Sequence, residues 1–334
     1  MITKKITPLA LGIFALCACA PSTTTTSSSS TEEENEFNWV SPVGIPAIAF
    51  FNQGENENWT STNTPASIIP SAFANGTFDA IVFDGINGLN QVTKKNAPYK
   101  MARWISGGTY YLVSVKHDSA EDLTSASTID SFVQGGIADQ AFLSLSEDAW
   151  GITDYTGIAY EEGVAATMAK LTSNPESFDF FLISQPQLTQ ATATLAQEGK
   201  TVNIIYNLQT EWKAEYGADA EIPAAGLFIS NKAVEEKKGK VDEFLDMIEK
   251  NIQTAVGNPS EVVSSLDAYE ALDTTSDADV QARFGFTQTL VSKLQANGAN
   301  GFNLVDGEAD AMTIANSFQS TIGGTAYPET AFLK

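Results

Sequence analysis

The chain contains two cysteines, Cys17 and Cys19, and both lie close to its N-terminus. The roughly 300 residues that follow therefore have no thiol for a disulfide, a thiolate metal site or a cysteine nucleophile. Their core must be stable by packing alone. Because a chain of this length exceeds what one hydrophobic core usually organises, we expect it to fold into two lobes.

The first residues have the pattern of an export signal. Lys4 and Lys5 precede a short apolar run from Pro8 to Leu16. This run is shorter than the about 20 apolar residues that a transmembrane helix needs, so we expect a signal peptide and not a membrane span.

The string Leu16, Cys17, Ala18, Cys19 resembles the bacterial lipobox, in which a large aliphatic residue, two small residues and a cysteine mark lipid attachment and cleavage. We expect residues 1–18 to be a lipoprotein signal peptide and Cys19 to carry the lipid. Cys17 fits less well, because Leu16 would stand where the peptidase needs a small side chain. The alternative is an ordinary secretory signal that is cut elsewhere. With the anchor, the protein would lie on the extracytoplasmic face of the cell membrane, at the cell surface or in the periplasm.

A polar segment separates this leader from the globular part. From Thr23 to Glu36 the chain reads TTTTSSSSTEEENE, which has almost nothing apolar to bury. We expect residues 19–36 to be a disordered tether. The composition changes at Phe37, Trp39 and Val40, where the folded part begins.

The charge of the chain narrows the class of its partners. Its formal net charge is −23 at pH 7, from 18 Lys+Arg and 41 Asp+Glu. Nucleic acid is excluded as a partner because phosphate binding needs clustered cations. Arg103 and Arg283 are the only arginines, and this scarcity argues against a highly charged anionic ligand.

Short apolar or β-rich runs alternate with helical segments. The expected strands are Ile45–Phe51, Phe78–Phe83, Tyr110–Val115, Phe180–Ile183 and Val202–Tyr206. Pro65–Ala74 suits a helix that ends near Asn75 and Gly76. Strands joined by helical connections predict parallel pairing and an α/β fold.

The last third of the chain predicts helices. Apolar residues from Val241 to Val256 fall at helical spacing on one face, and Gly257 ends the pattern. Asn258, Pro259 and Glu261 have the types expected at the start of the next helix. A further helix is expected over Ser276–Asn297.

The chain shows no catalytic motif. His117 is the only histidine, so a multi-histidine metal site is excluded and a catalytic triad would have to include it. It lies in the polar connection SVKHDSAEDL, where we expect a solvated loop residue. No G-x-S-x-G, P-loop or H-E-x-x-H string is present. We expect neither an enzyme nor a cofactor or metal site.

Three strings carry a resemblance to a known family. They are FDAIVFDGINGLNQVTKKNAPYKMARWISGGTYYLVS (78–114), IPAAGLFISNKAVEEKKGKVDEFLDMIEKNIQTAVGNPSEV (222–262) and the ending IGGTAYPETAFLK (322–334). In this order and spacing they resemble the solute-binding proteins of nitrate, sulfonate and thiamine-precursor ABC importers, and more closely a lipoprotein branch with unassigned ligands. The resemblance covers nearly the whole chain after the leader.

The resemblance implies the type II periplasmic-binding-protein fold, in which two α/β lobes joined by two hinge crossings close over a ligand. Lobe I would comprise residues 37–114 and 222–334, and lobe II with the hinge segments residues 115–221. The crossings would lie near Val113–Lys116 and near Leu208–Ile222. The implied partners are a small-molecule ligand, an ABC transporter permease and, through Cys19, the membrane, and the implied state is a monomer.

The resemblance also nominates a binding site, because ligands of open α/β sheets bind beyond the carboxyl ends of the strands. The expected ligand-binding residues are Pro42, Gly44, Asp84, Gly85, Asn87, Trp104, Gly108, Thr109, Tyr110, Gly135, Gly136, Ser184, Gln185 and Pro223. Asp84 would either face the cleft or cap the following helix. Trp104 and Tyr110 would either stack on a ring or lie in the core.

These residues favour a neutral or cationic heterocycle, such as a vitamin precursor, as the ligand. Two other functions stay open. An enzyme built on the same fold would be favoured by a His–Asp pair around His117 that faces the cleft. A surface lipoprotein with no transport role would have no enclosed pocket between its lobes.

Overall fold

The computed structural model describes residues 36–272, 275–295, 302–305, 307 and 310–334. The chain divides into two units, Met1–Glu36 and Phe37–Lys334, and the second is the folded unit described below. The predicted signal peptide (1–18), the lipidation site Cys19 and all but the last residue of the predicted tether (19–36) lie outside the described residues. Among the described helices, none has both the length and the apolar character that crossing a membrane requires.

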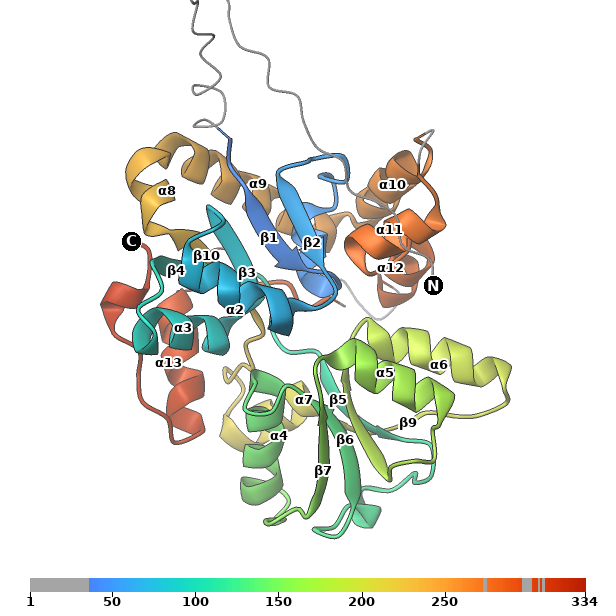
Figure 1. Ribbon diagram of the computed structural model, residues 1–334. Coiled ribbons are helices and arrows are strands. Elements are labelled where there is room, and N and C mark those ends of the chain that lie inside the picture. The colour runs from blue at the N-terminus through green and yellow to red at the C-terminus, as the bar shows by residue number, and fades with distance from the viewer. Residues whose placement is uncertain (1–35, 273–274, 296–301, 306, 308–309) are drawn as a thin grey trace, which may run out of the picture. The chain divides into compact units, whose positions relative to one another are not determined.

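The first sheet has five strands in the order β2-β1-β3-β10-β4 (Figure 1). They are β1 (Trp39–Pro42), β2 (Trp59–Thr62), β3 (Ala80–Asp84), β4 (Tyr99–Trp104) and β10 (Ala225–Ser230). β1 pairs in parallel with β2 and β3, while β10 lies antiparallel between β3 and β4. A strand from late in the chain therefore completes a sheet that the N-terminal segment begins.

Helices cover both faces of this sheet. One face carries α2 (Pro65–Asn75), α3 (Gly85–Lys94) and α13 (Ala311–Thr321), and the other carries the 3₁₀ helix η1 (Ile45–Phe50), α8 (Asn231–Glu236) and α9 (Lys238–Gly257). Successive side chains of β3 point to opposite faces, so Ile81 packs in one core cluster and Val82 in the other. The helices α10 (Pro259–Glu270), α11 (Asp277–Phe284) and α12 (Gln288–Gln295) extend the second cluster beside α9.

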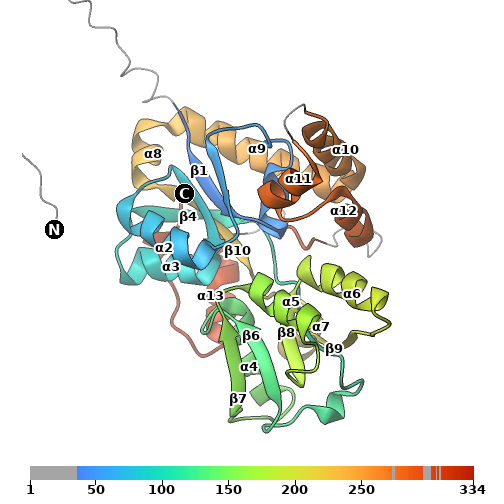
Figure 2. The same ribbon diagram turned by 45° about the vertical axis from the view of Figure 1, so that its right-hand side comes forward.

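The second sheet repeats this plan with five strands in the order β7-β6-β8-β5-β9. They are β5 (Tyr110–Ser114), β6 (Thr128–Phe132), β7 (Gly157–Glu161), β8 (Phe180–Ser184) and β9 (Asn203–Asn207). Its antiparallel strand is β5, which pairs with β8 and β9. The helices α4 (Ile137–Asp148) and α7 (Leu208–Tyr216) pack on one face, and α5 (Val164–Ser173) and α6 (Gln187–Gln197) on the other (Figure 2). Two short 3₁₀ helices, η2 (Ala120–Asp122) and η3 (Glu329–Ala331), complete the described elements.

The chain passes between the sheets along two segments, which we call the first crossing (105–109) and the second crossing (217–224). They run side by side, because Gly108 N donates to Ile222 O at 2.6 Å and Ala224 N donates to Ser106 O at 3.0 Å. Gly107 N also donates to Asn303 O at 2.8 Å, so a C-terminal segment reinforces the pair. These hydrogen bonds join both lobes at one strip of backbone.

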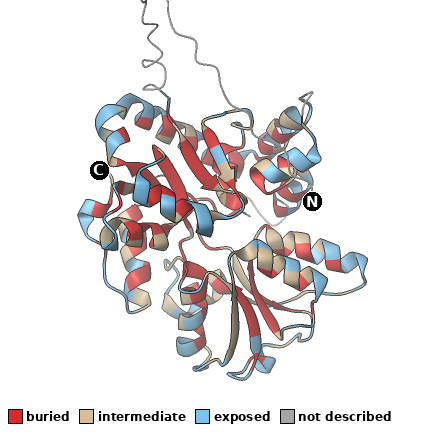
Figure 3. Ribbon diagram, viewed as in Figure 1, coloured by how far each residue is buried: buried red, intermediate tan, exposed pale blue. Residues whose placement is uncertain are grey.

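The two sheets and their helices confirm the expected α/β fold with two lobes, and Figure 3 shows buried residues along the central strands of both sheets. The expected boundary at residue 114 is wrong, because β5 belongs to the second sheet. The first crossing thus precedes β5 and does not lie at Val113–Lys116. The second crossing lies at the end of the expected range 208–222, because Leu208–Tyr216 forms α7.

Two expected elements differ in the structure. The run Ile45–Phe51 forms the 3₁₀ helix η1 and no strand, since Gly44 turns the backbone at φ 96° and Pro46 follows without an N–H for a ladder. The expected helix Ser276–Asn297 is divided into α11 and α12, because Gly285 ends α11 in the left-handed conformation at φ 76°. Helix α2 ends within one residue of its expected limit, α9 begins three residues before the expected pattern and ends at the expected Gly257, and α10 begins at the expected Pro259.

The close approach of α3 to its sheet depends on a residue without a side chain. A Cβ atom on Gly88 would lie 2.3 Å from Cζ of the buried Phe228. We expect Gly88→Ala to lower the free energy of unfolding by about 1–3 kcal/mol in a urea titration, because the added methyl overpacks the core. Gly239→Ala is the matched control, since nothing lies within 4 Å of its added Cβ and alanine favours helix. Equal losses in both variants would contradict this account of the packing.

Candidate functional site

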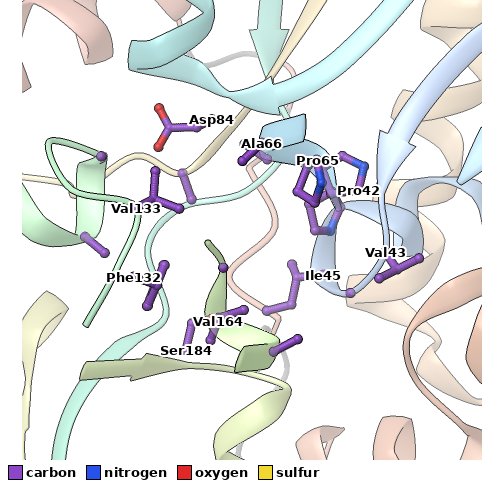
Figure 4. A pocket seen from close by; sticks show the side chains of 18 of the residues that line it. Pro42, Val43, Ile45, Pro65, Ala66, Asp84, Phe132, Val133, Val164 and Ser184 are labelled. Atoms are coloured by element: carbon purple, nitrogen blue, oxygen red, sulfur yellow. The ribbon is translucent and has the colours of Figure 1, made fainter. Parts of the chain in front are cut away.

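A cavity of about 400 Å³ lies between the two sheets (Figure 4). It is lined from the first sheet's side by segments that follow β1, β2 and β3, and from the second by segments that follow β6, β7 and β8. The first crossing and Ala224 and Ala225 close it at the back. The cavity thus lies where the carboxyl ends of six parallel strands face each other, which is the position that open α/β sheets use for ligands.

The helices that follow these strands begin at the cavity. The first residues of α2, α3, α4 and α5 line it, as does Gln187 at the start of α6. Gly136 and Gly163, at the N-caps of α4 and α5, supply no side-chain cap. The backbone N–H groups of these first turns are therefore left to partners from elsewhere in the protein or from a ligand.

The lining is mainly apolar. Ile45 and Pro65 lie on one side of the cavity, and Phe132 and Val164 on the other (Figure 4). The rings of Phe132 and Tyr110 are 6.3 Å apart at their centroids. Such a lining suits a ligand with an apolar or aromatic body.

Two carboxylates are the charged groups of the lining. Among the described residues around the cavity, Asp84 and Glu162 carry charge, and none is a lysine, arginine or histidine. Glu162 is exposed and Asp84 is half-buried. The described side chains around the cavity therefore carry negative charge that no cation among them balances.

Asp84 joins the two sides of the cavity. Its Oδ1 accepts a hydrogen bond from Asn87 N at 2.8 Å and so caps α3. Its Oδ2 accepts from Ile137 N at 3.3 Å, in the first turn of α4 on the opposite lobe. The two roles that the sequence left open for Asp84, helix cap and cleft residue, are both present.

The surroundings of Asp84 disfavour its charged form. Burial raises the pKa of Asp84 to about 6, against the opposing effect of the backbone N–H donors of Asn87, Ile137 and Ile86. Burial also raises the pKa of Tyr327, to about 12, and the negative charge of Asp84 adds to that shift. The pKa of Tyr110 is raised by the same two causes in the same order.

Many of the residues nominated from the sequence line the cavity. They are Pro42, Gly44, Asp84, Asn87, Thr109, Tyr110, Gly136, Ser184 and Gln185. They come from both lobes and from the first crossing, so the structure brings them together around one space. Their contact with a ligand stays a prediction.

The other nominated residues lie outside the lining. Trp104 is buried in the core, where its indole N–H donates to Ala311 O at 3.0 Å, so it offers no stacking surface to the cavity. Gly85 packs against that ring, since a Cβ there would lie 2.0 Å from Cζ3 of Trp104. Gly108 and Pro223 belong to the hydrogen-bonded crossings. Gly135 N donates to Asp139 Oδ2 at 2.8 Å, next to the cavity but not in its wall.

Two stretches of the lining were not predicted from the sequence. They are residues 63–67, at the start of α2, and residues 162–166, at the start of α5. Each follows a strand that was not expected, β2 with the polar string WTST and β7 with the string GIAYE, and no residue of β7 is fully buried in the structure. Since the carboxyl ends of strands point to the site, a correct assignment of these two strands would have found both stretches.

His117 does not lie at the cavity. It follows β5 at the end away from the first crossing, within 3.4 Å of Asp122 and 3.8 Å of Asp179, and stacks on Phe180. The His–Asp pair that would favour an enzyme therefore exists, but it does not face the cleft. The described residues form no cluster of three or more side chains that could hold a metal ion.

Solved structures share this architecture. The ABC transporter structure from Parabacteroides distasonis has a TM-score of 0.61 and 14% sequence identity over 90% of this chain and 99% of that one. The ligand-binding component of an ABC-type import system from Staphylococcus aureus, with zinc bound, has a TM-score of 0.62 and 10% identity over 89% and 96%. The alkanesulfonate-binding protein SsuA from Xanthomonas axonopodis pv. citri, bound to MOPS, has a TM-score of 0.59 and 10% identity over 86% and 91%.

The chain has the periplasmic-binding-protein fold. This confirms the fold expected from the sequence, with two α/β lobes and two crossings. Comparisons with models of protein families and with curated proteins gave no match. At 10–14% identity the solved structures show the fold alone, so their ligands are not transferred to this cavity.

The raised pKa of Asp84 predicts a pH dependence of stability. Because the folded protein binds this proton more tightly than the unfolded chain, Asp84 destabilises the fold above pH 6 and ceases to do so as the pH falls toward 4. Between pH 7.5 and 4.5 the free energy of unfolding of the wild type should rise by about 2 kcal/mol relative to that of Asp84→Asn. Urea unfolding at a series of pH values measures this difference.

Asp84→Ser is the control for this prediction, because serine also caps a helix and carries no titrating group. Its pH profile should run parallel to that of Asp84→Asn. If the free energy of unfolding of the wild type depends on pH in the same way as that of both variants, the raised pKa of Asp84 is contradicted.

Proposed function

We propose that the protein captures a small molecule between its two lobes outside the cytoplasm and delivers it to the permease of an ABC importer. It would act as a monomer held on the membrane by a lipid on Cys19, and no chemistry would be performed on the ligand. The observation that carries the proposal is the cavity itself. It is lined from both lobes and backed by a crossing segment, so a ligand within it would contact both halves of the protein.

The two crossings support a mechanism of lobe closure. We infer that the two sheets pivot about this hydrogen-bonded strip, whose first crossing lines the cavity. A ligand that contacts both lobes stabilises the closed arrangement relative to the open one. Closure of this kind is the step that a permease can recognise.

The proposed ligand is a neutral or cationic heterocycle, of the kind found in vitamin precursors. Support comes from the apolar lining with the rings of Phe132 and Tyr110, and from carboxylates as the charged groups around the cavity. Nitrate-like and phosphate-like anions fit poorly, because no described cationic side chain lines the cavity.

The two alternative functions lack such support. The His117 cluster lies away from the cavity, so a catalytic pair has no access to a bound molecule. A scaffold without transport would need no cavity between the lobes, whereas one of about 400 Å³ is present.

Mass spectrometry of the small molecules that copurify with the full-length protein identifies the ligand, and calorimetry with the pure compound measures its affinity.

A pair of variants on α5 locates the site. Ala165 is exposed and lines the cavity, whereas Ala169, one turn later, is exposed and does not. We expect Ala165→Trp to weaken binding at least tenfold by filling the cavity, and Ala169→Trp to bind like the wild type.

Equal affinity of the two variants would place the ligand elsewhere. If no molecule copurifies and none from a panel of vitamins, nucleobases, sulfonates and amino acids binds, the solute-binding function itself is contradicted. Delivery is tested by uptake of the identified compound into cells with and without the protein.

A further inference from the structure

The carboxylate of Asp84 lies between the first turns of two helices from different lobes. One oxygen is bound by Asn87 N of α3 and the other by Ile137 N of α4. Gly136, at the N-cap of α4, has no side chain to cap this helix. Asp84 therefore supplies from across the cavity the acceptor that α4 lacks in its own sequence.

This contact fills a position that an anionic ligand would need. A sulfonate or carboxylate group in the cavity would gain most from backbone N–H donors and the positive end of a helix dipole. At the first turn of α4 an oxygen of Asp84 already holds the donor of Ile137. A second negative group there would find the Ile137 N–H already bound, and the negative charge of Asp84 would repel it.

Asp84 also has no cationic partner among the residues that the structure describes. None of the ion pairs among the described residues includes it, and the other charged residue of the lining, Glu162, is also an acid. Each carboxylate oxygen can accept more than one hydrogen bond, so Asp84 retains acceptor capacity toward the cavity. A half-buried carboxylate without a counter-charge is stabilised by a cation that arrives with the ligand.

We propose that Asp84 determines the charge of the ligand: its carboxylate excludes anions from the first turn of α4 and pairs with an ammonium or amidinium group of the bound molecule. This inference rests on the proposed function, and it narrows the ligand class from neutral or cationic to cationic. The apolar walls hold the body of the ligand, and Asp84 holds its charged end.

The test uses two probes with the same body and opposite charges, benzylammonium and phenylmethanesulfonate. Calorimetry compares the full-length wild type with Asp84→Ser and Glu162→Gln. Serine keeps the cap on α3 but is too short to reach α4, so it removes the charge and frees the Ile137 N–H. Glu162→Gln removes one charge from the same cavity and leaves both helix ends unchanged.

The wild type should bind benzylammonium at least tenfold more tightly than phenylmethanesulfonate. In Asp84→Ser this order should reverse, with at least a tenfold gain for the sulfonate, while Glu162→Gln should keep the wild-type order, because it leaves the Asp84–Ile137 contact in place. The inference is overturned if the wild type binds both ions equally, if Asp84→Ser gains no sulfonate affinity, or if Glu162→Gln reproduces the reversal. The proposed function is judged separately, by the copurified molecule and the Ala165→Trp variant, so a failure of one is distinguishable from a failure of the other.

Discussion

The architecture depends on the hydrogen bonds that hold the two crossings side by side. Gly108 N to Ile222 O and Ala224 N to Ser106 O lock two backbone segments that are more than 100 residues apart in sequence. Immediately after these contacts, β5 and β10 enter their sheets as the antiparallel strands. The remaining strands of each sheet then run parallel, and in both lobes their carboxyl ends face the same space. The cavity is thus a consequence of how the chain crosses, and the side chains decide only what fits within it.

Local patterns predicted the parts of the fold that local physics controls. The apolar stripe of α9, the left-handed Gly76 after α2 and the proline that opens α10 lie where the sequence placed them. The pattern failed where a tertiary contact overrides composition. The apolar run after Gly44 became a 3₁₀ helix, and the polar WTST became the edge strand β2 because β1 offers it a partner. An edge strand with one bonded neighbour needs fewer apolar residues. The alternation of apolar and polar residues that predicts a strand is therefore weak in such a segment.

The residues of the site also differ in how far the sequence predicted them. Asp84 after β3 and Ser184 after β8 follow strands that were expected. Gly44 after β1 and Gly136 after β6 were nominated through the resemblance although their strands were not expected, and the residues after β2 and β7 were missed with their strands. Aromatic side chains were the least predictable, since sequence does not tell which face of a sheet a residue at a strand end takes. Trp104 entered the core, where Gly85 leaves room for its ring, while Tyr110 lines the cavity. Both outcomes require the register of β4 and β5, which tertiary pairing determines.

Asp84 shows why a helix cap and a cleft residue are compatible roles for one side chain. A carboxylate at the junction of β3 and α3 uses one oxygen for the cap and presents the other outward, and here the N–H of Ile137 meets it. Each N–H donor lowers the pKa of this group, yet burial prevails and raises it. Burial therefore makes the ionised form of Asp84 less stable than it would be in water. The hydrogen bond from Ile137 N on the opposite lobe offsets part of this cost. Separation of the lobes breaks this contact but readmits water to the carboxylate. Under the proposed function, a ligand that brings a positive charge would shift the balance toward the closed form, because it would replace the lost water with a direct counter-charge.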